Sequence, residues 1–215
     1  VLSGITLTPP FAGGTTNYTA SVSNTTASAT VTPTVHDATA TVTVNGTTVA
    51  SGNPSASIPL SVGPNTITTI VTAQDGTPNT YTVVVTRAQS SDATLSNMVL
   101  SGITLTPPFA SGTTNYTASV SNTTASTTVT PTVHDATAAV TVNGTPVASG
   151  NASAAIPLSV GPNTITTVVT AQDGTPNTYT VIVTKAGSSD ATLSAMVLSG
   201  ITLTPSFAGG TNNYT

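Results

Sequence analysis

The sequence repeats itself with a period of 98 residues. The heptapeptide Val1–Leu7 returns at Val99 and again at Val197, so the chain holds two whole periods and 19 further residues. The two copies differ at 11 of 98 aligned positions, and most changes are mild, such as Ile70 to Val168. A unit of this length matches one independent domain. We therefore expect tandem domains rather than a solenoid whose short units depend on their neighbours.

Each copy has the pattern of β-strands. Thr, Val and Ile dominate, which favours strands and argues against disorder. Tyr18, Ala20 and Val22 alternate with polar residues, as expected for a strand with one buried face. About seven such signals recur per period, and none has helical periodicity. The sequence predicts an all-β protein of tandem immunoglobulin-like antiparallel β-sandwich domains, about seven strands each.

The clearest local signal is a hairpin around Asn45–Gly46. This dipeptide accepts the positive φ angles of a type I′ turn, so a two-residue loop is expected. That register pairs Val42 with Val49 on the inner side and Thr43 with Thr48 outside.

Further strand and turn signals follow the same alternation. Ile67, Ile70 and Val71 do not alternate, so their strand is predicted to be covered on both faces or bulged. In the last strand Tyr81, Val83 and Val85 are predicted to face inward. The segments are a strand in Thr30–His36, a strand with Ile58, Leu60 and Val62, a turn at Gly63–Asn65, a strand in Thr66–Ala73 and a loop at Gln74–Asn79.

We place the domain boundaries near Ser90–Asp92 and Ser188–Asp190, because Ala93–Ser96 reads as the opening of a first strand that runs to Leu105. The first domain then lacks the start of its first strand. The third segment is a first strand with no sandwich, and one strand cannot bury its own apolar face. We expect it to be the cut end of a further repeat or a strand donated to another subunit, in a mature chain or a piece of a longer one. The predicted segments are residues 1–90, 91–188 and 189–215.

The charge content excludes several classes of function. The chain has 2 basic and 6 acidic residues, a net charge of -4 and no cysteine. Two cations cannot neutralise a phosphate backbone or hold an anionic membrane surface, so no nucleic-acid partner is expected. No run approaches the roughly 18 apolar residues of a membrane-spanning helix, and no signal-peptide pattern begins the chain.

Several segments resemble the bacterial cadherin-like β-sandwich domain, a tandem module of large secreted and surface proteins. The resemblance spans the whole repeat, and it implies an immunoglobulin-like fold and an extracellular or cell-surface location. The matching segments are Ala93–Ser96, Thr114–Val120, Ala138–Gly144, Val160–Ile165, Thr170–Gly174 and Thr178–Thr184.

The acidic residues depart from the calcium-binding pattern of true cadherins. The chain has no Glu, and each repeat offers three Asp, such as Asp37, Asp75 and Asp92. Calcium takes 6–8 oxygen ligands, usually with several carboxylates. We therefore expect no calcium joint and no cofactor, and we interpret Asp75–Gly76 and its copy Asp173–Gly174 as plain turns.

The dipeptide His36–Asp37, repeated at His134–Asp135, is the one candidate for chemistry. It could be an acid/base pair, or its histidine could share a zinc ion with another subunit. Neighbours in a strand point to opposite faces, so we expect neither role. Lys185 is matched by Arg87 in the first copy, which excludes a repeated lysine–asparagine cross-link. We predict no catalytic, cofactor-binding or metal-ligating residue and no enzyme activity.

Two functions remain. A Thr- and Ser-rich surface with little charge does not repel its own copies, and its strand edges can pair with other strands. The first hypothesis is a structural protein that builds an extracellular filament, stalk or sheath and has itself as partner, with strand addition between subunits. The alternative is an adhesin or carbohydrate-binding module. Attached glycans are also left open, because the chain contains Asn-x-Ser/Thr acceptor triplets. These triplets begin at Asn17, Asn24 and Asn45, at the copies of these residues, and at Asn151.

Overall fold

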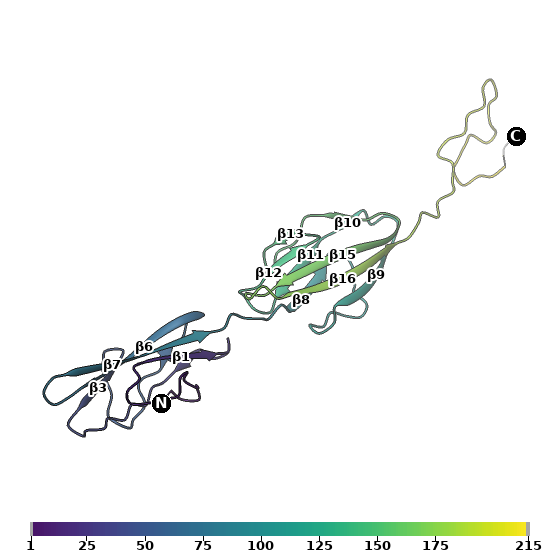
Figure 1. Cartoon of the computed structure of the whole chain (residues 1–215). Helices are drawn as coiled ribbons and strands as arrows, with labels where there is room; N and C mark the ends of the chain where they lie inside the picture. The colour runs from purple at the N-terminus through teal and green to yellow at the C-terminus, as the bar shows by residue number, and fades with distance from the viewer. Residues whose placement is uncertain (1, 214–215) are drawn as a thin grey trace. The chain divides into compact units, whose positions relative to one another are not determined.

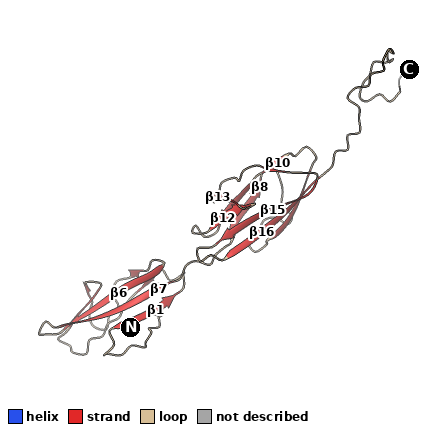
Figure 2. Cartoon of the chain, turned by 45° about the horizontal axis from the view of Figure 1, so that its top comes forward, coloured by secondary structure: helices blue, strands red, loops and turns tan. Residues whose placement is uncertain are grey.

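The computed structural model describes residues 2–213, and its regular structure is entirely β (Figure 1, Figure 2). Val1 and the last two residues of the predicted third segment lie outside the described residues. The chain forms two compact units. One holds the residues up to Ala93 with the loops His134–Ala139 and Thr170–Pro176, and the other holds the rest from Thr94 on.

The first repeat is a sandwich with a five-stranded sheet as its main layer. The order in this sheet is β1-β7-β6-β3-β4, and β2 and β5 form a two-stranded piece of the second layer. The described part of this repeat holds seven strands, as predicted: β1 (Asn17–Val22), β2 (Ser28–Ala29), β3 (Thr41–Val44), β4 (Thr47–Thr48), β5 (Ile58–Pro59), β6 (Gly63–Thr72) and β7 (Pro78–Arg87).

The second repeat has the same main sheet, in the order β13-β12-β15-β16-β9. Its second layer is larger, because β8 pairs with β11 in addition to the pair β10 and β14. The nine strands found here are β8 (Leu95–Leu100), β9 (Asn115–Val120), β10 (Ser126–Thr127), β11 (Val129–Val133), β12 (Ala139–Val142), β13 (Thr145–Val147), β14 (Ile156–Pro157), β15 (Gly161–Thr170) and β16 (Pro176–Lys185).

The tandem all-β sandwich is confirmed, with one exception to antiparallel pairing in each repeat. Strand β1 runs parallel to β7, in register from Asn17 with Thr82 to Val22 with Arg87, and β9 pairs with β16 in the same way. In each repeat the two partners are far apart in the sequence. The strands between them supply the long crossover that a parallel pair needs, and no local sequence pattern predicts this pairing.

The predicted hairpin is confirmed. Asn45 has φ 47° and Gly46 has φ 81°, the positive values that a type I′ turn requires. Thr43 pairs with Thr48, and Val49 donates its backbone N–H to Val42 at 3.0 Å. Both valines of this pair are buried.

The pairing of β6 with β7 excludes one of two predicted alternatives, the bulge, and corrects one predicted turn. The register runs without a shift from Gly63 opposite Arg87 to Thr72 opposite Pro78, so the strand has no bulge against β7. The predicted turn at Gly63–Asn65 is wrong, because these residues already belong to β6. The chain bends just before them, where Asn65 binds both backbone groups of Ser61 at 2.8 Å.

The predicted first strand is confirmed as β8, although it ends at Leu100 rather than Leu105. The third segment has the same sequence pattern but a different structure. Up to residue 213 it contains only an isolated bridge between Leu198 and Ile201.

Candidate functional site: an open sandwich face and an unpaired strand

The candidate chemical residues of the first repeat form turns. Asp37 is exposed and accepts a hydrogen bond from the Thr39 backbone N–H at 2.9 Å, which lowers the pKa of its carboxyl. The predicted plain turn at Asp75 is confirmed, since Thr77 N–H donates to this carboxylate at 2.9 Å and lowers its pKa. Within residues 2–213 no three His, Asp or Glu side chains gather closely enough to hold a metal ion.

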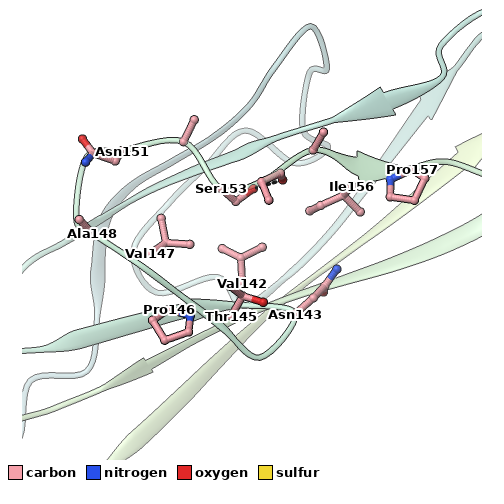
Figure 3. Close-up of a pocket in the computed structure, with 13 residues that line it drawn as sticks. Val142, Asn143, Thr145, Pro146, Val147, Ala148, Asn151, Ser153, Ile156 and Pro157 are labelled. Carbon is pink, nitrogen blue, oxygen red and sulfur yellow. Dashed lines mark hydrogen bonds between the residues drawn. The ribbon is translucent and has the colours of Figure 1, made fainter.

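Two hollows of the described surface differ in their lining, and the one of about 450 Å³ is lined by His36 among aliphatic and small residues. The other, of about 390 Å³, lies beside β12 and β13, and the aliphatic side chains of Val142, Val147 and Ile156 point into it (Figure 3). Its polar residues face other partners: Ser153 Oγ donates to Ala154 O at 2.9 Å, and Asn143 Oδ1 accepts from the Thr166 N–H at 2.9 Å. No titratable side chain lines this hollow.

The two cations are structural. Arg87 donates to Leu60 O at 2.8 Å, and Lys185 donates to Leu158 O at 3.0 Å, so each binds the equivalent carbonyl in its own repeat. Arg87 also donates to Asn24 O at 2.7 Å. These contacts explain why either cation is accepted at this position.

Strand β8 closes the second layer of the second repeat. Leu95, Met98 and Leu100 are at most 2% exposed, while Val99 points outward at 49%. The strand pairs with β11, and the side chains beneath it are sealed: Val169 on β15 and Tyr179 on β16 are both 0% exposed.

The same face of the first repeat is open. In the described residues only Leu2 bridges Val31, and the rest of Val31–Val35 forms no strand. The equivalents of the sealed side chains, Val71 and Tyr81, are half-buried instead. The inward orientation predicted for the last strand therefore holds fully in the second repeat and only partly in the first.

The tyrosine hydroxyls of the two repeats also have different hydrogen-bond donors. Tyr179 Oη accepts the backbone N–H of Leu95 at 3.0 Å. In the first repeat Tyr81 Oη accepts instead from the Asn79 side-chain amide at 3.1 Å. Phe11 stacks on Tyr18 with ring centroids 5.7 Å apart but remains 62% exposed.

The third segment repeats the sequence of β8 but forms no strand in the described chain. Residues 191–198 repeat 93–100 with one change, Asn97 to Ala195, and Asn97 is exposed in β8. The apolar side chains of this segment have no sandwich to cover them in the described chain. Leu193 is 60% exposed and Leu198 is 45% exposed, whereas Leu95 and Leu100 are buried.

Two segments of the chain match a known family model, the cadherin-like beta sandwich domain. The match covers residues 2–88 and 95–186. The chain belongs to this family. Cadherin-like domains are typically extracellular and non-enzymatic, so family membership indicates a surface or adhesion-type extracellular repeat protein.

A curated relative matches part of the chain. A protein named "Putative membrane protein" from Evansella cellulosilytica is 42% identical over 85 residues, which is 40% of this chain but only 13% of that protein. The chain thus spans a small part of its relative's length. The described residues contain no helix long and apolar enough to cross a membrane.

Solved structures of related architecture include cadherin ectodomains. Mouse cadherin-23 EC22-24 is 13% identical with a TM-score of 0.32, over 84% of this chain and 66% of that one. The human desmocollin-1 ectodomain is 14% identical with a TM-score of 0.34, over 88% and 43%. Fibronectin(III)-like modules of CbhA from Clostridium thermocellum are 18% identical with a TM-score of 0.22, over 85% and 95%. These TM-scores are too low to add to the family assignment.

Proposed function

We propose that this protein is a non-enzymatic structural subunit of a bacterial surface, which builds a filament, stalk or sheath from tandem sandwich domains. Copies join by strand addition: residues 191–198 of one copy complete the first repeat of the next. The domain division at residues 1–90, 91–188 and 189–215 is part of this proposal. The observation that carries it is the tandem of two near-identical sandwich repeats with few charged residues, followed by a segment that repeats the sequence of β8.

The second repeat shows what the completed face looks like. The side chains that β8 buries there have identical counterparts in the first repeat, from Val31–Val35 on one side to Val71, Tyr81 and Val83 on the other. The 11 differences between the copies leave these positions untouched. A strand that fits the second repeat therefore fits the first with the same contacts.

The donated segment also presents the right side chains. Leu193, Met196 and Leu198 match the buried Leu95, Met98 and Leu100 of β8. Burial of a leucine side chain contributes about 1.5–3 kcal/mol. Main-chain hydrogen bonds to an exposed strand add affinity, as in other cases of β-strand addition.

Low charge supports association between copies. A net charge of -4 over 215 residues gives weak repulsion between neighbouring subunits. Strand edges with few lysines are not protected against pairing.

The test is assembly of the 215-residue chain, measured by light scattering after size-exclusion chromatography and by electron microscopy. We expect concentration-dependent end-to-end oligomers. Leu193→Asp should leave monomers, because the charge would enter the sandwich core. The matched control is Val197→Asp, since the equivalent Val99 points outward, and it should assemble normally. Dispersed wild-type molecules, or oligomers that survive Leu193→Asp, would contradict strand addition.

A second candidate function is a cell-surface adhesin or carbohydrate-binding module, with glycans as partners. It is supported by the exposed ring of Phe11, which lies 6.2 Å from that of Tyr81. Exposed aromatic rings are typical of sugar platforms. A glycan array should then show selective binding that Phe11→Ala removes, and an array with no signal excludes this function.

A further inference from the structure

The segment that leads into β8 contains a buried serine whose hydroxyl is bound to a carboxylate. Ser90 is 6% exposed, and its Oγ donates to Asp135 Oδ2 at 2.5 Å. The same oxygen accepts the Asp92 N–H at 3.3 Å. A serine hydroxyl has one proton and two lone pairs. One lone pair therefore remains free on an oxygen whose proton is already held by a carboxylate.

A side-chain amide is bound to the backbone of the same serine. The Ser90 N–H donates to Gln172 Oε1 at 3.1 Å, and Ser90 O accepts the Asp173 N–H at 3.0 Å. An N–H bound to a carbonyl oxygen stabilises the negative charge that forms there when the carbonyl carbon is attacked. Gln172 Nε2 makes no hydrogen bond in the described chain, so no contact holds this nitrogen on its carbon.

These three residues supply the parts of an acyl transfer. Ser90 is the nucleophile, Asp135 is a base within hydrogen-bond distance of it, and Gln172 is a polarised acyl group. All three lie in the same compact unit. Asp135 and Gln172 are half-buried beside the buried serine, so water has little access to a bond formed at this place.

We infer that Ser90 and Gln172 form an ester cross-link within the chain. Ser90 Oγ forms a bond to Gln172 Cδ, and the bond from Cδ to Nε2 breaks. Asp135 takes the hydroxyl proton and passes it to Nε2, which leaves as ammonia, so the step needs no other reactant. This inference goes beyond the proposed function and does not depend on strand addition.

The acidity of Asp135 sets the pace of the reaction. Its hydrogen bonds, first the one from Ser90, lower its pKa to about 2, so the carboxyl is ionised at neutral pH but is a weak base. We therefore expect slow conversion, and the contacts described above are those of the chain before it reacts. The fixed placement of both reacting groups in one site compensates for the weak base.

The cross-link would lock β8 into the sandwich. It joins two residues 82 positions apart, one just before β8 and one in the loop between β15 and β16. The chain has no cysteine, so no disulfide can restrain this strand. A covalent bond across so long a loop restricts the unfolded chain, and it holds under a pulling force that separates hydrogen bonds.

The test is a digest of the purified 215-residue chain, taken at intervals during incubation at neutral pH. A protease that cuts before aspartate places Ser90 in the fragment 75–91 and Gln172 in the fragment 135–172. We expect a joined fragment that grows with time, with the summed mass of both fragments less one ammonia. Hydroxylamine should split it, because this reagent cleaves esters. Ammonia loss at Asn-Gly sequences joins no fragments, so it is not mistaken for the ester.

Variants assign the reacting groups. Ser90→Ala and Gln172→Glu should abolish the joined fragment, and Gln172→Glu keeps an acceptor for the Ser90 N–H while it removes the ammonia leaving group. The matched controls Ser91→Ala and Gln74→Glu, both at exposed positions, should leave its yield unchanged. Asp135→Asn should slow the conversion by about 100-fold or more, because the base is lost.

Separate fragments of full mass at every time point would overturn the cross-link and leave Ser90 with hydrogen bonds alone. A joined fragment that persists in Ser90→Ala would also overturn it, and an unchanged rate in Asp135→Asn would overturn the role of Asp135. The digest is made on denatured chains, so its result is independent of association between copies. A monomeric chain that forms the ester would contradict the proposed assembly and support this inference.

Discussion

The segments Val31–Val35 and Val129–Val133 have the same five residues, yet only the second is a strand. The difference is the partner. Val129–Val133 pairs with β8, whereas the first segment has one isolated bridge in the described chain, to Leu2, besides its hydrogen bonds to Gly52 and Ser55. A segment without a neighbouring strand gains little from its own propensity. Near-identical repeats in one chain therefore differ in secondary structure because one neighbouring strand differs.

The largest expected change in stability tests whether β8 causes the structural difference between the two repeats. Leu95→Ala should destabilise the second repeat by about 2–5 kcal/mol, because it opens a cavity under a fully buried side chain. The same change at Leu193 should cost less than about 0.5 kcal/mol in a dilute, monomeric sample, since Leu193 is 60% exposed. Native-state hydrogen exchange, followed separately over each repeat, measures both. Equal losses of stability from the two substitutions would contradict the proposal that β8 closes the second repeat.

A smaller effect is expected from the tyrosine hydroxyls. Tyr179→Phe should cost about 1–3 kcal/mol, because it leaves the buried Leu95 N–H without its acceptor. Tyr81→Phe should cost less than about 1 kcal/mol, as its partner Asn79 is exposed and can turn to water. Urea denaturation of the two variants measures the difference. A larger loss at Tyr81 would show that the first repeat is closed in solution.

A substitution at Thr167 should stabilise the second repeat rather than destabilise it. The Thr167 hydroxyl is buried and, in the described structure, makes no hydrogen bond. Thr167→Val should therefore stabilise the second repeat by about 1 kcal/mol, since it removes a desolvated polar group and keeps the shape. Thr69→Val, on the open face, should change the stability by less than about 0.5 kcal/mol. Thermal unfolding measures both variants, and a loss at Thr167 would mean that its hydroxyl has a partner.

The smallest effect concerns pH. The hydrogen bond from Ser90, followed by those from Thr137, lowers the pKa of Asp135 from 3.8 to about 2. A pKa lowered by folding contributes stability above pH 3.8 that is lost as the pH falls toward 2. Ser90→Ala should raise the Asp135 pKa toward that of Asp37, whose carboxyl accepts hydrogen bonds from Thr39 in the described chain. Carbon NMR titration of the carboxyls measures this, and an unchanged pKa would exclude the Ser90 contact.

Local signals in the sequence predicted more of the fold than of the site. The Asn45–Gly46 hairpin follows from two residues whose positive φ angles leave few other turns. The parallel partner of β1 could not be predicted, because β7 lies about sixty residues away and pairing over that distance depends on the whole sandwich. The turn expected at Gly63–Asn65 was misplaced because Asn65 binds the preceding bend with its side chain, so these residues can extend into β6.

The sequence by itself determined the repeat, the all-β class and the absence of clustered charge, because period, alternation and composition are properties of the chain read in order. The tertiary structure alone decided which copy of a segment becomes a strand and which apolar residues stay uncovered. Leu95 and Leu193 occupy the same place in the repeat, and only the presence of a sandwich beneath Leu95 separates a core residue from an exposed one. Burial depends on neighbours distant in sequence, which a local pattern does not encode.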